Sequence, residues 1–353
     1  MLHYFILLAY ILVICIIPIK SSKVKLLLCF IPFFLFFASR VDWTPDYYNY
    51  EELFYQIHDN KQYSIDSNIS EYGFKFLCII LPSYRSLIWV ITLLYTSSLY
   101  LLFYKFIIRK YWLVAFIILF VNHQFLLGTI SAMRSCVVAS LFIFALHAKL
   151  NRLKIIPFLL LIVAFFFHRS AIVLIFFLAF ERFKHSRTVL YWIVVLIFIL
   201  ITISFLNPSF FSSKLLGILE SSNTFESYSQ YISISKLSVF FYINILINVF
   251  IIITNIYLLV KSKNYSFWLL LSIFYYTILS IPNIGMISRF TSYLGPAILV
   301  GLSSWDEMGV KYKLLKYSYI GIIIASCLYF FIFSFTKYSG FHLYINYHST
   351  LFK

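Results

Sequence analysis

The sequence predicts an all-α, polytopic membrane protein with about twelve transmembrane segments. Of its 353 residues, 62% are apolar, 22% are aromatic and only 11% are charged, a composition far from that of soluble domains. Apolar runs recur along the whole chain, and no polar interruption between them is long enough for a soluble domain. We therefore expect a single transmembrane domain over residues 1–353, in which some segments are short or broken.

The net charge of +16 does not indicate a nucleic-acid-binding protein, because the basic residues lie in short clusters between apolar runs. Such clusters follow the positive-inside rule for cytoplasmic loops of membrane proteins. We therefore expect no nucleic acid partner. The clusters are Lys20, Lys23, Lys25; Lys105, Arg109, Lys110; Lys149, Arg152, Lys154; Arg182, Lys184, Arg187; Lys261, Lys263; and Lys311, Lys313, Lys316.

If all six clusters are cytoplasmic, the segments alternate around them and both termini are periplasmic. Residues 1–19 then form a first span, since they lack the basic n-region and cleavage site of a signal peptide. Two large loops face outward, 40–85 and 207–235, and the first contains most of the acidic residues. The expected segments are 2–19, 26–39, 86–108, 111–127, 131–148, 155–167, 170–181, 188–206, 236–260, 265–281, 289–305 and 317–336.

Two of these segments, 155–167 and 170–181, are shorter than the ~20 residues that cross a bilayer. If the two segments formed one long helix, the basic clusters at 149–154 and 182–187 would lie in opposite compartments. We therefore expect a chain reversal at His168 and Arg169. Irregular backbone at that depth is tolerated only where protein surrounds it or where it lines a water-filled cavity.

Three arginines stand at outward-facing helix N-termini: Arg134, with Ser131 as its expected N-cap, Arg169 and Arg289. A cation there opposes the helix dipole unless an anion lies nearby. Together with free backbone N–H groups, the arginines would suit a phosphate or diphosphate. The alternative interpretation is that they extend to lipid headgroups at the membrane interface.

His168 is a candidate general base or a charge-assisted hydrogen-bond donor to a phosphate, and it could equally be a neutral buried histidine bonded to a backbone carbonyl. Asp42 and Asp46, just after the second segment, could deprotonate an acceptor hydroxyl or hold a sugar, or serve as turn and cap residues. Tyr50, Tyr228 and Tyr231 suit sugar stacking or interfacial anchoring. The histidines and the five cysteines lack metal-ligand spacing, so we expect no metal.

The order of these motifs resembles the EpsG-like group of bacterial polysaccharide polymerases, which is related to the Wzy O-antigen polymerases. The matching residues are Asp46 and Tyr50; Glu71, Gly73 and Phe74; Arg134 followed by a basic turn; Phe167, His168, Arg169, Ser170 and Ala171; and Ser288, Arg289 and Phe290.

The resemblance implies a glycosyltransferase of the bacterial inner membrane, similar to GT-C enzymes, that polymerises O-antigen, capsule or exopolysaccharide repeat units on the periplasmic face. Its donor and acceptor would be oligosaccharides linked to undecaprenyl pyrophosphate, used without cofactor or nucleotide sugar. Membrane lipid, a chain-length regulator and a flippase of the same pathway would be its partners. Arg134, His168, Arg289 and Asp46 would be catalytic, and Arg169, Asp42, Tyr50, Glu71, Tyr228 and Tyr231 would bind substrate.

Other classes of membrane protein remain open at this point. A flippase or transporter of lipid-linked sugar also needs cations, but in a central cavity and commonly with inverted repeats, which the sequence lacks. An O-antigen ligase would use a similar donor with similar arginine and histidine residues. A membrane O-acyltransferase would need a histidine on the inner side, where His147 is the candidate.

Overall fold

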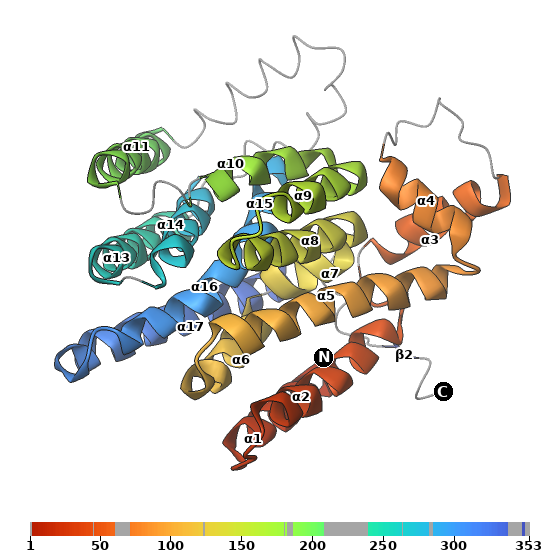
Figure 1. Ribbon diagram of the computed structural model, residues 1–353, viewed down its shortest axis with the longest axis horizontal. Helices are drawn as coiled ribbons and strands as arrows, with labels where there is room; N and C mark the ends of the chain where they lie inside the picture. Colours follow the sequence, from red (N-terminus) through yellow and green to blue (C-terminus); the bar gives the residue numbers. More distant parts are fainter. Residues whose placement is uncertain are drawn as a thin grey trace, which may run out of the picture. The chain divides into compact units, whose positions relative to one another are not determined.

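The computed structural model describes residues 2–44, 46–60, 71–122, 124–179, 181, 186–207, 239–262, 264–281, 285–337 and 348–349, which are almost entirely helical (Figure 1). The chain divides into two compact units, Met1–Leu178 with Cys327–Lys353, and Ala179–Ser326. The all-α class is confirmed, while the assignment of 1–353 to a single polymerase domain stays a prediction.

The first unit is built around the helix α8, whose apolar sequence is mostly buried. Helix α8 packs against α5 and α9, and α2 packs against α5 (Figure 1). Its helices are α1 (Leu2–Ile16), α2 (Ser22–Ala38), α3 (Tyr47–Asn60), α4 (Tyr72–Ile80), α5 (Tyr84–Phe106), α6 (Trp112–Val121), α7 (Thr129–Ser131), α8 (Met133–Leu150), α9 (Ile156–Phe167) and α10 (Val173–Ala179), whose last residue falls in the second unit.

Short irregular segments connect several of these helices. A π-helical turn at Gln124–Gly128 follows α6, and a 3₁₀ turn at Arg169–Ile172 follows α9. The strand β1 (Arg40–Val41) pairs antiparallel with β2 (His348–Ser349). Helix α9 ends at Phe167 and His168 takes an extended conformation, so the helix is interrupted at His168, while the expected reversal of the chain direction there stays a prediction.

The second unit contains α11 (Arg187–Leu206), α13 (Val239–Lys261), α14 (Ser266–Leu279), α15 (Gly285–Leu294), α16 (Pro296–Gly301) and most of α17 (Lys313–Lys337). Helices α13 and α14 pack against each other. Buried amide and hydroxyl groups connect them: Asn255 donates to Ser272 over 3.1 Å and accepts from Tyr319 of α17 over 2.7 Å. Such bonds hold apolar helices together where the hydrophobic effect does not act.

The predicted count of about twelve spans is not supported. Among the described helices, five are long and apolar enough to cross a membrane: those over 84–106, 133–150, 188–206, 241–261 and 313–332. The helical segments Arg109–Val121 and Phe125–Ser131 are bent by 67° relative to each other, and they make a sixth span if they are counted as one. The apolar helices α1, α9 and α14 have only 12 to 15 residues. Apolar character marked the helices correctly, but several are too short to span a bilayer alone.

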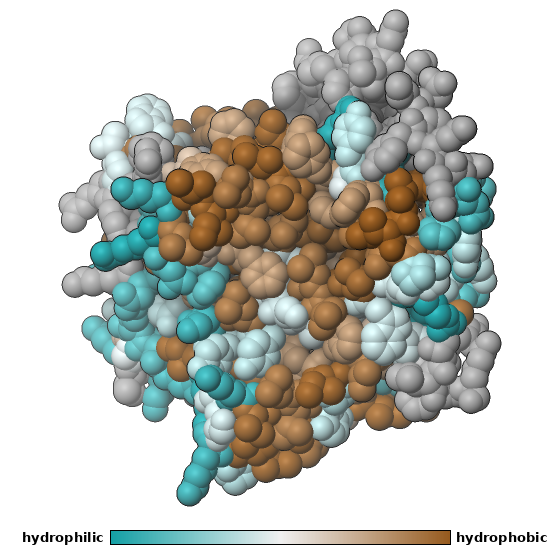
Figure 2. Space-filling view, turned by 45° about the vertical axis from the view of Figure 1, so that its right-hand side comes forward, coloured by the Kyte–Doolittle hydropathy of each residue, from teal (hydrophilic) through white to brown (hydrophobic). Residues whose placement is uncertain are grey.

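Large apolar side chains are exposed along many helices of both units, and Figure 2 shows them gathered in continuous areas of the surface. Soluble proteins rarely expose continuous apolar areas of large size. Together with the five to six spanning helices they show a protein integral to a membrane.

The expected outward loop at 40–85 is only partly a loop, because it contains α3 and α4. Phe54 of α3 is fully buried, and the Tyr84 hydroxyl of α5 donates to the Tyr47 carbonyl over 2.8 Å. This segment is therefore part of the packed first unit. The second expected loop, 207–235, lies almost wholly outside the described residues.

Candidate functional site

Three ionisable side chains from three different helices meet in the first unit. Glu71 is the N-cap residue of α4, Arg134 lies in the first turn of α8, and His168 is the C-cap residue of α9. Each stands at a helix end, and together we call them the Glu71–Arg134–His168 cluster. The packing of α4 and α8 against α9 brings these distant parts of the sequence together.

The Glu71 carboxylate is the centre of the cluster. Its Oε2 forms an ion pair with Nη1 of Arg134, and its Oε1 lies 3.1 Å from Nδ1 of His168. Glu71 and His168 are each only 7% exposed, whereas the Arg134 side chain is 28% exposed. The anion that the N-terminal position of Arg134 requires is therefore supplied by the protein itself.

Tyr50 of α3 completes the surroundings of Arg134. Its hydroxyl accepts a hydrogen bond from Nε of Arg134 over 3.4 Å, and its ring centroid lies 5.7 Å from the guanidinium carbon. Tyr50 is itself buried and packs against Phe74 of α4. The guanidinium is thus held on two sides, by a carboxylate and by an aromatic ring.

Gly73 allows α4 to approach the end of α9 closely. A Cβ at this position would lie 2.9 Å from the Phe167 ring and 3.1 Å from the Phe166 carbonyl oxygen. Such a close approach is one use of glycine. Because Gly73 follows Glu71 by two residues and Phe167 precedes His168, this contact sets the separation of Glu71 and His168.

The electrostatic balance favours the ionised form of Glu71. Burial would raise the pKa of this carboxyl group, but the contact with His168 and the charge of Arg134 outweigh it, and the pKa is lowered. An ionised carboxylate has no proton to donate, so the His168 nitrogen that faces it must carry the hydrogen. In the neutral ring, Nε2 is then the proton acceptor.

Asp46 lies beside the cluster but has a different partner. Its Oδ2 accepts a hydrogen bond from the Ser131 hydroxyl over 3.1 Å. Ser131 was expected to cap the helix of Arg134, and this expectation is wrong: Ala132 is the N-cap residue and makes no side-chain cap bond. Ser131 instead ends α7 and connects it to the start of α3.

Sequence reasoning missed Arg40, which lies at the start of the predicted first loop. It is 2% exposed and donates to the Phe37 carbonyl over 2.5 Å, to Thr92 Oγ1 over 3.0 Å and to the Ile130 carbonyl over 3.3 Å. These bonds join α2, α5 and α7. The bonded residue of α7, Ile130, precedes Arg134 by four residues. The place of Arg40 directly after an apolar run was the available signal in the sequence.

The other predicted site residues stand apart from this cluster or cannot be placed. Asp42 has a positive φ of 48° and lies near the exposed Tyr48. The Arg169 side chain is exposed and, in the described part of the chain, forms no hydrogen bond or ion pair. The backbone of Arg289 belongs to α15, but its side chain, like all of Tyr228 and Tyr231, lies outside the described structure. The convergence of three arginines stays a prediction.

No group of three or more His, Cys, Asp or Glu side chains in the described ranges is arranged to hold a metal ion. The chemistry of the cluster is that of a histidine oriented by a carboxylate, beside a cation that can meet an anionic group. We therefore consider reactions in which a proton is removed and an anion leaves.

Comparison with known proteins gives one clear result. No curated protein and no solved structure matches the chain. The family model described as EpsG family matches residues 23–349, a range that contains the whole Glu71–Arg134–His168 cluster. The chain is therefore a member of the EpsG family.

Proposed function

We propose that this membrane protein is a polysaccharide polymerase that transfers glycan from an undecaprenyl-pyrophosphate-linked donor to the non-reducing end of a lipid-linked acceptor repeat unit. The observation that carries the proposal is the Glu71 carboxylate between His168 and Arg134. It combines a proton acceptor and a cation in one buried site, at the end of helices in a membrane protein.

In the proposed reaction, His168 acts as the general base. Its Nε2 takes the proton of the acceptor hydroxyl while that oxygen forms a bond to the anomeric carbon of the donor. Glu71 is a positioning residue in this step, because it fixes the ring orientation and stabilises the protonated imidazole, as the aspartate does in serine protease triads. Asp46, which accepts from Ser131, is the alternative base.

Arg134 stabilises the leaving group. As the bond between the anomeric carbon and the phosphate oxygen breaks, the electron pair goes to the diphosphate, which remains on the undecaprenyl carrier. Removing one preorganised donor to a developing anion typically costs ~10²–10³ in rate. The exposed part of Arg134 is where the diphosphate would contact it.

The proposed setting is the periplasmic face of the bacterial inner membrane. The support is the basic turn between α8 and α9, because a cytoplasmic position of this turn would put the start of α8 and the end of α9 toward the opposite face. The competing proposals are that the protein is a flippase of lipid-linked sugar or an O-antigen ligase.

Loss of this protein in its host distinguishes the three. If it is a polymerase, the surface glycan is reduced to single repeat units. If it is a ligase, free lipid-linked polymer accumulates, and if it is a flippase, no repeat unit reaches the outside. Complementation with His168→Ala should give the single-unit phenotype at normal protein level, while Arg85→Ala, which removes an exposed arginine at the start of α5, should restore full chain length.

A further inference from the structure

An apolar groove lies between α4 and α9, and two of the residues that line it, Tyr72 and Phe167, are the sequence neighbours of Glu71 and His168. The hollow has a volume of about 530 Å³, and among the described residues that line it only Tyr72 has an ionisable side chain. We call it the α4–α9 groove; it is lined by Tyr72, Gly73, Phe76 and Leu77 of α4 and by Val163, Phe166 and Phe167 of α9.

The sequence connects the groove to the cluster at both helices. Tyr72 directly follows Glu71, and Phe167 directly precedes His168. The close contact of Gly73 with Phe167 holds the two helices together at this end. An extended apolar molecule in the groove would therefore have one end at the ionic cluster.

Arg134 provides a contact for a negatively charged end group. Its Nη1 and Nε are occupied by Glu71 and Tyr50, but Nη2 makes no hydrogen bond with any residue that the structure describes. The side chain is 28% exposed. A partly exposed guanidinium with a remaining donor is a good partner for a phosphate oxygen.

We propose that the α4–α9 groove holds the hydrocarbon chain of the donor's polyprenyl carrier, with its diphosphate at Arg134. The identity of the carrier in this proposal rests on the proposed function. A chain leaving the bilayer gains little hydrophobic free energy, since lipid is as apolar as the groove. The groove therefore acts by orienting the chain, and the affinity depends on the diphosphate and Arg134.

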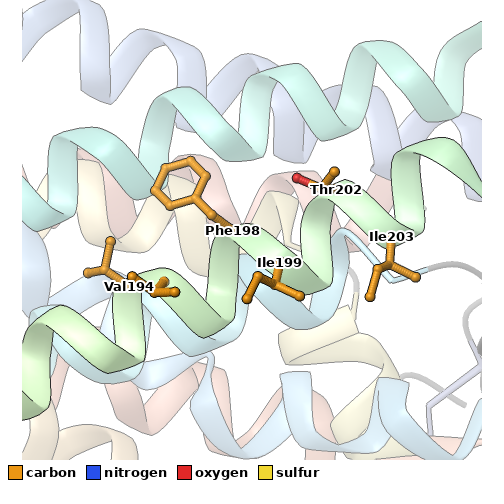
Figure 3. A pocket seen from close by; sticks show the side chains of 6 residues that line it. Val194, Phe198, Ile199, Thr202 and Ile203 are labelled. Atoms are coloured by element: carbon orange, nitrogen blue, oxygen red, sulfur yellow. The ribbon is translucent and has the colours of Figure 1, made fainter.

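A second hollow supplies an internal control. It lies along α11 and is lined by residues of that helix alone, including Val194, Phe198, Ile199 and Thr202 (Figure 3). None of the described residues that line it is ionisable, so they offer a lipid no ionic partner. It should bind bilayer lipids without regard to their head groups.

The test is photo-crosslinking of the full-length protein in vesicles, using a photoreactive phenylalanine analogue in place of Phe166 in the groove. The matched controls replace Ile162, an exposed residue of α9 outside the lining, and Phe198 of α11. The probe is isotope-labelled undecaprenyl diphosphate in phosphatidylglycerol and phosphatidylethanolamine vesicles. Excess unlabelled undecaprenyl diphosphate and undecaprenol serve as competitors.

We expect excess diphosphate to reduce labelling at position 166 by at least about 10-fold, with no effect of undecaprenol and no change at positions 162 and 198. Arg134→Gln should reduce labelling at 166 to the level of the controls. Equal labelling at all three positions, or competition by undecaprenol alone, would overturn the proposal. This assay measures binding and not polymerisation. It can therefore support carrier binding in the α4–α9 groove even if the host experiment shows that the protein is a flippase or a ligase.

Discussion

The Glu71 carboxylate lies 3.1 Å from Nδ1 of His168 while its second oxygen pairs with Arg134. One acidic residue thus orients a histidine and neutralises a cation. This arrangement makes Glu71 the residue whose removal should affect both halves of the proposed reaction.

Glu71→Gln should reduce polymer formation by at least about 100-fold, because the amide neither stabilises a protonated imidazole nor balances Arg134. The change also leaves a partly buried guanidinium without its anion, which should lower the free energy of unfolding by about 1–3 kcal/mol. The measurements are surface glycan length on gels and thermal unfolding in detergent.

Glu52→Gln is the matched control, since Glu52 is an exposed residue of the same acidic segment whose carboxylate accepts a hydrogen bond from Gln56. It should behave as wild type in both assays. A Glu71→Gln protein that makes full-length glycan would show that the carboxylate has no part in the reaction.

Gly73→Ala should impair activity more than stability. The added Cβ would lie 3.1 Å from the Phe166 carbonyl and 2.9 Å from the Phe167 ring, so α4 must move away from α9 and Glu71 from His168. The helix itself gains up to about 1 kcal/mol from replacing glycine. We expect shorter glycan chains from a protein present at its normal level.

The double variant Gly73→Ala, Phe167→Leu tests this geometry directly. A smaller side chain removes the contact with the ring but not the contact with the carbonyl, so activity should recover in part. If Gly73→Ala alone has wild-type activity, then the approach of the two helices does not control the site.

Much of this architecture could be predicted from the sequence, because apolar runs bounded by basic clusters mark helices reliably. The helix end at His168 followed from the basic clusters on either side of two short apolar segments, and Arg134 was singled out by the high cost of ionisable groups among apolar residues. The helices α3 and α4 were not predicted, since their tyrosines and charges are typical of a loop. Pairing of Glu71 with His168 depends on long-range packing, which one sequence does not specify.

The pH dependence of stability should show the contribution of Glu71. Its pKa is lowered in the folded protein, so the stabilisation is complete above the ordinary carboxyl pKa of about 4.3 and is lost as the pH falls through the lower folded value. The difference in unfolding temperature between wild type and Glu71→Gln should therefore shrink as the pH falls below about 4. A difference that keeps growing below about pH 4 would contradict the assigned ionisation.

Arg40→Ala should destabilise the first unit. It removes the donor to two backbone carbonyls and to Thr92 in a site that is 2% exposed, and unsatisfied buried acceptors cost about 1–3 kcal/mol each. The expected result is a lower unfolding temperature in detergent and less protein in the membrane. Arg85→Ala, at an exposed position, should leave both unchanged, and an equally stable Arg40→Ala protein would refute this role.

Asp46→Asn separates the two candidate bases. The amide keeps an oxygen that can accept the Ser131 hydrogen bond, so the connection between α7 and α3 is preserved, but it cannot take up a proton. If His168 is the base, Asp46→Asn should retain most of the activity, whereas His168→Ala should lose about 100-fold or more. If Asp46 is the base, the asparagine variant should be as inactive as the histidine variant.

Ser131→Ala is the structural control, because it removes only the hydrogen bond to Asp46. Under either assignment it should lower the free energy of unfolding by about 1 kcal/mol without abolishing polymer. Loss of activity in Asp46→Asn with normal stability would therefore move the proton acceptor from the end of α9 to the start of α3.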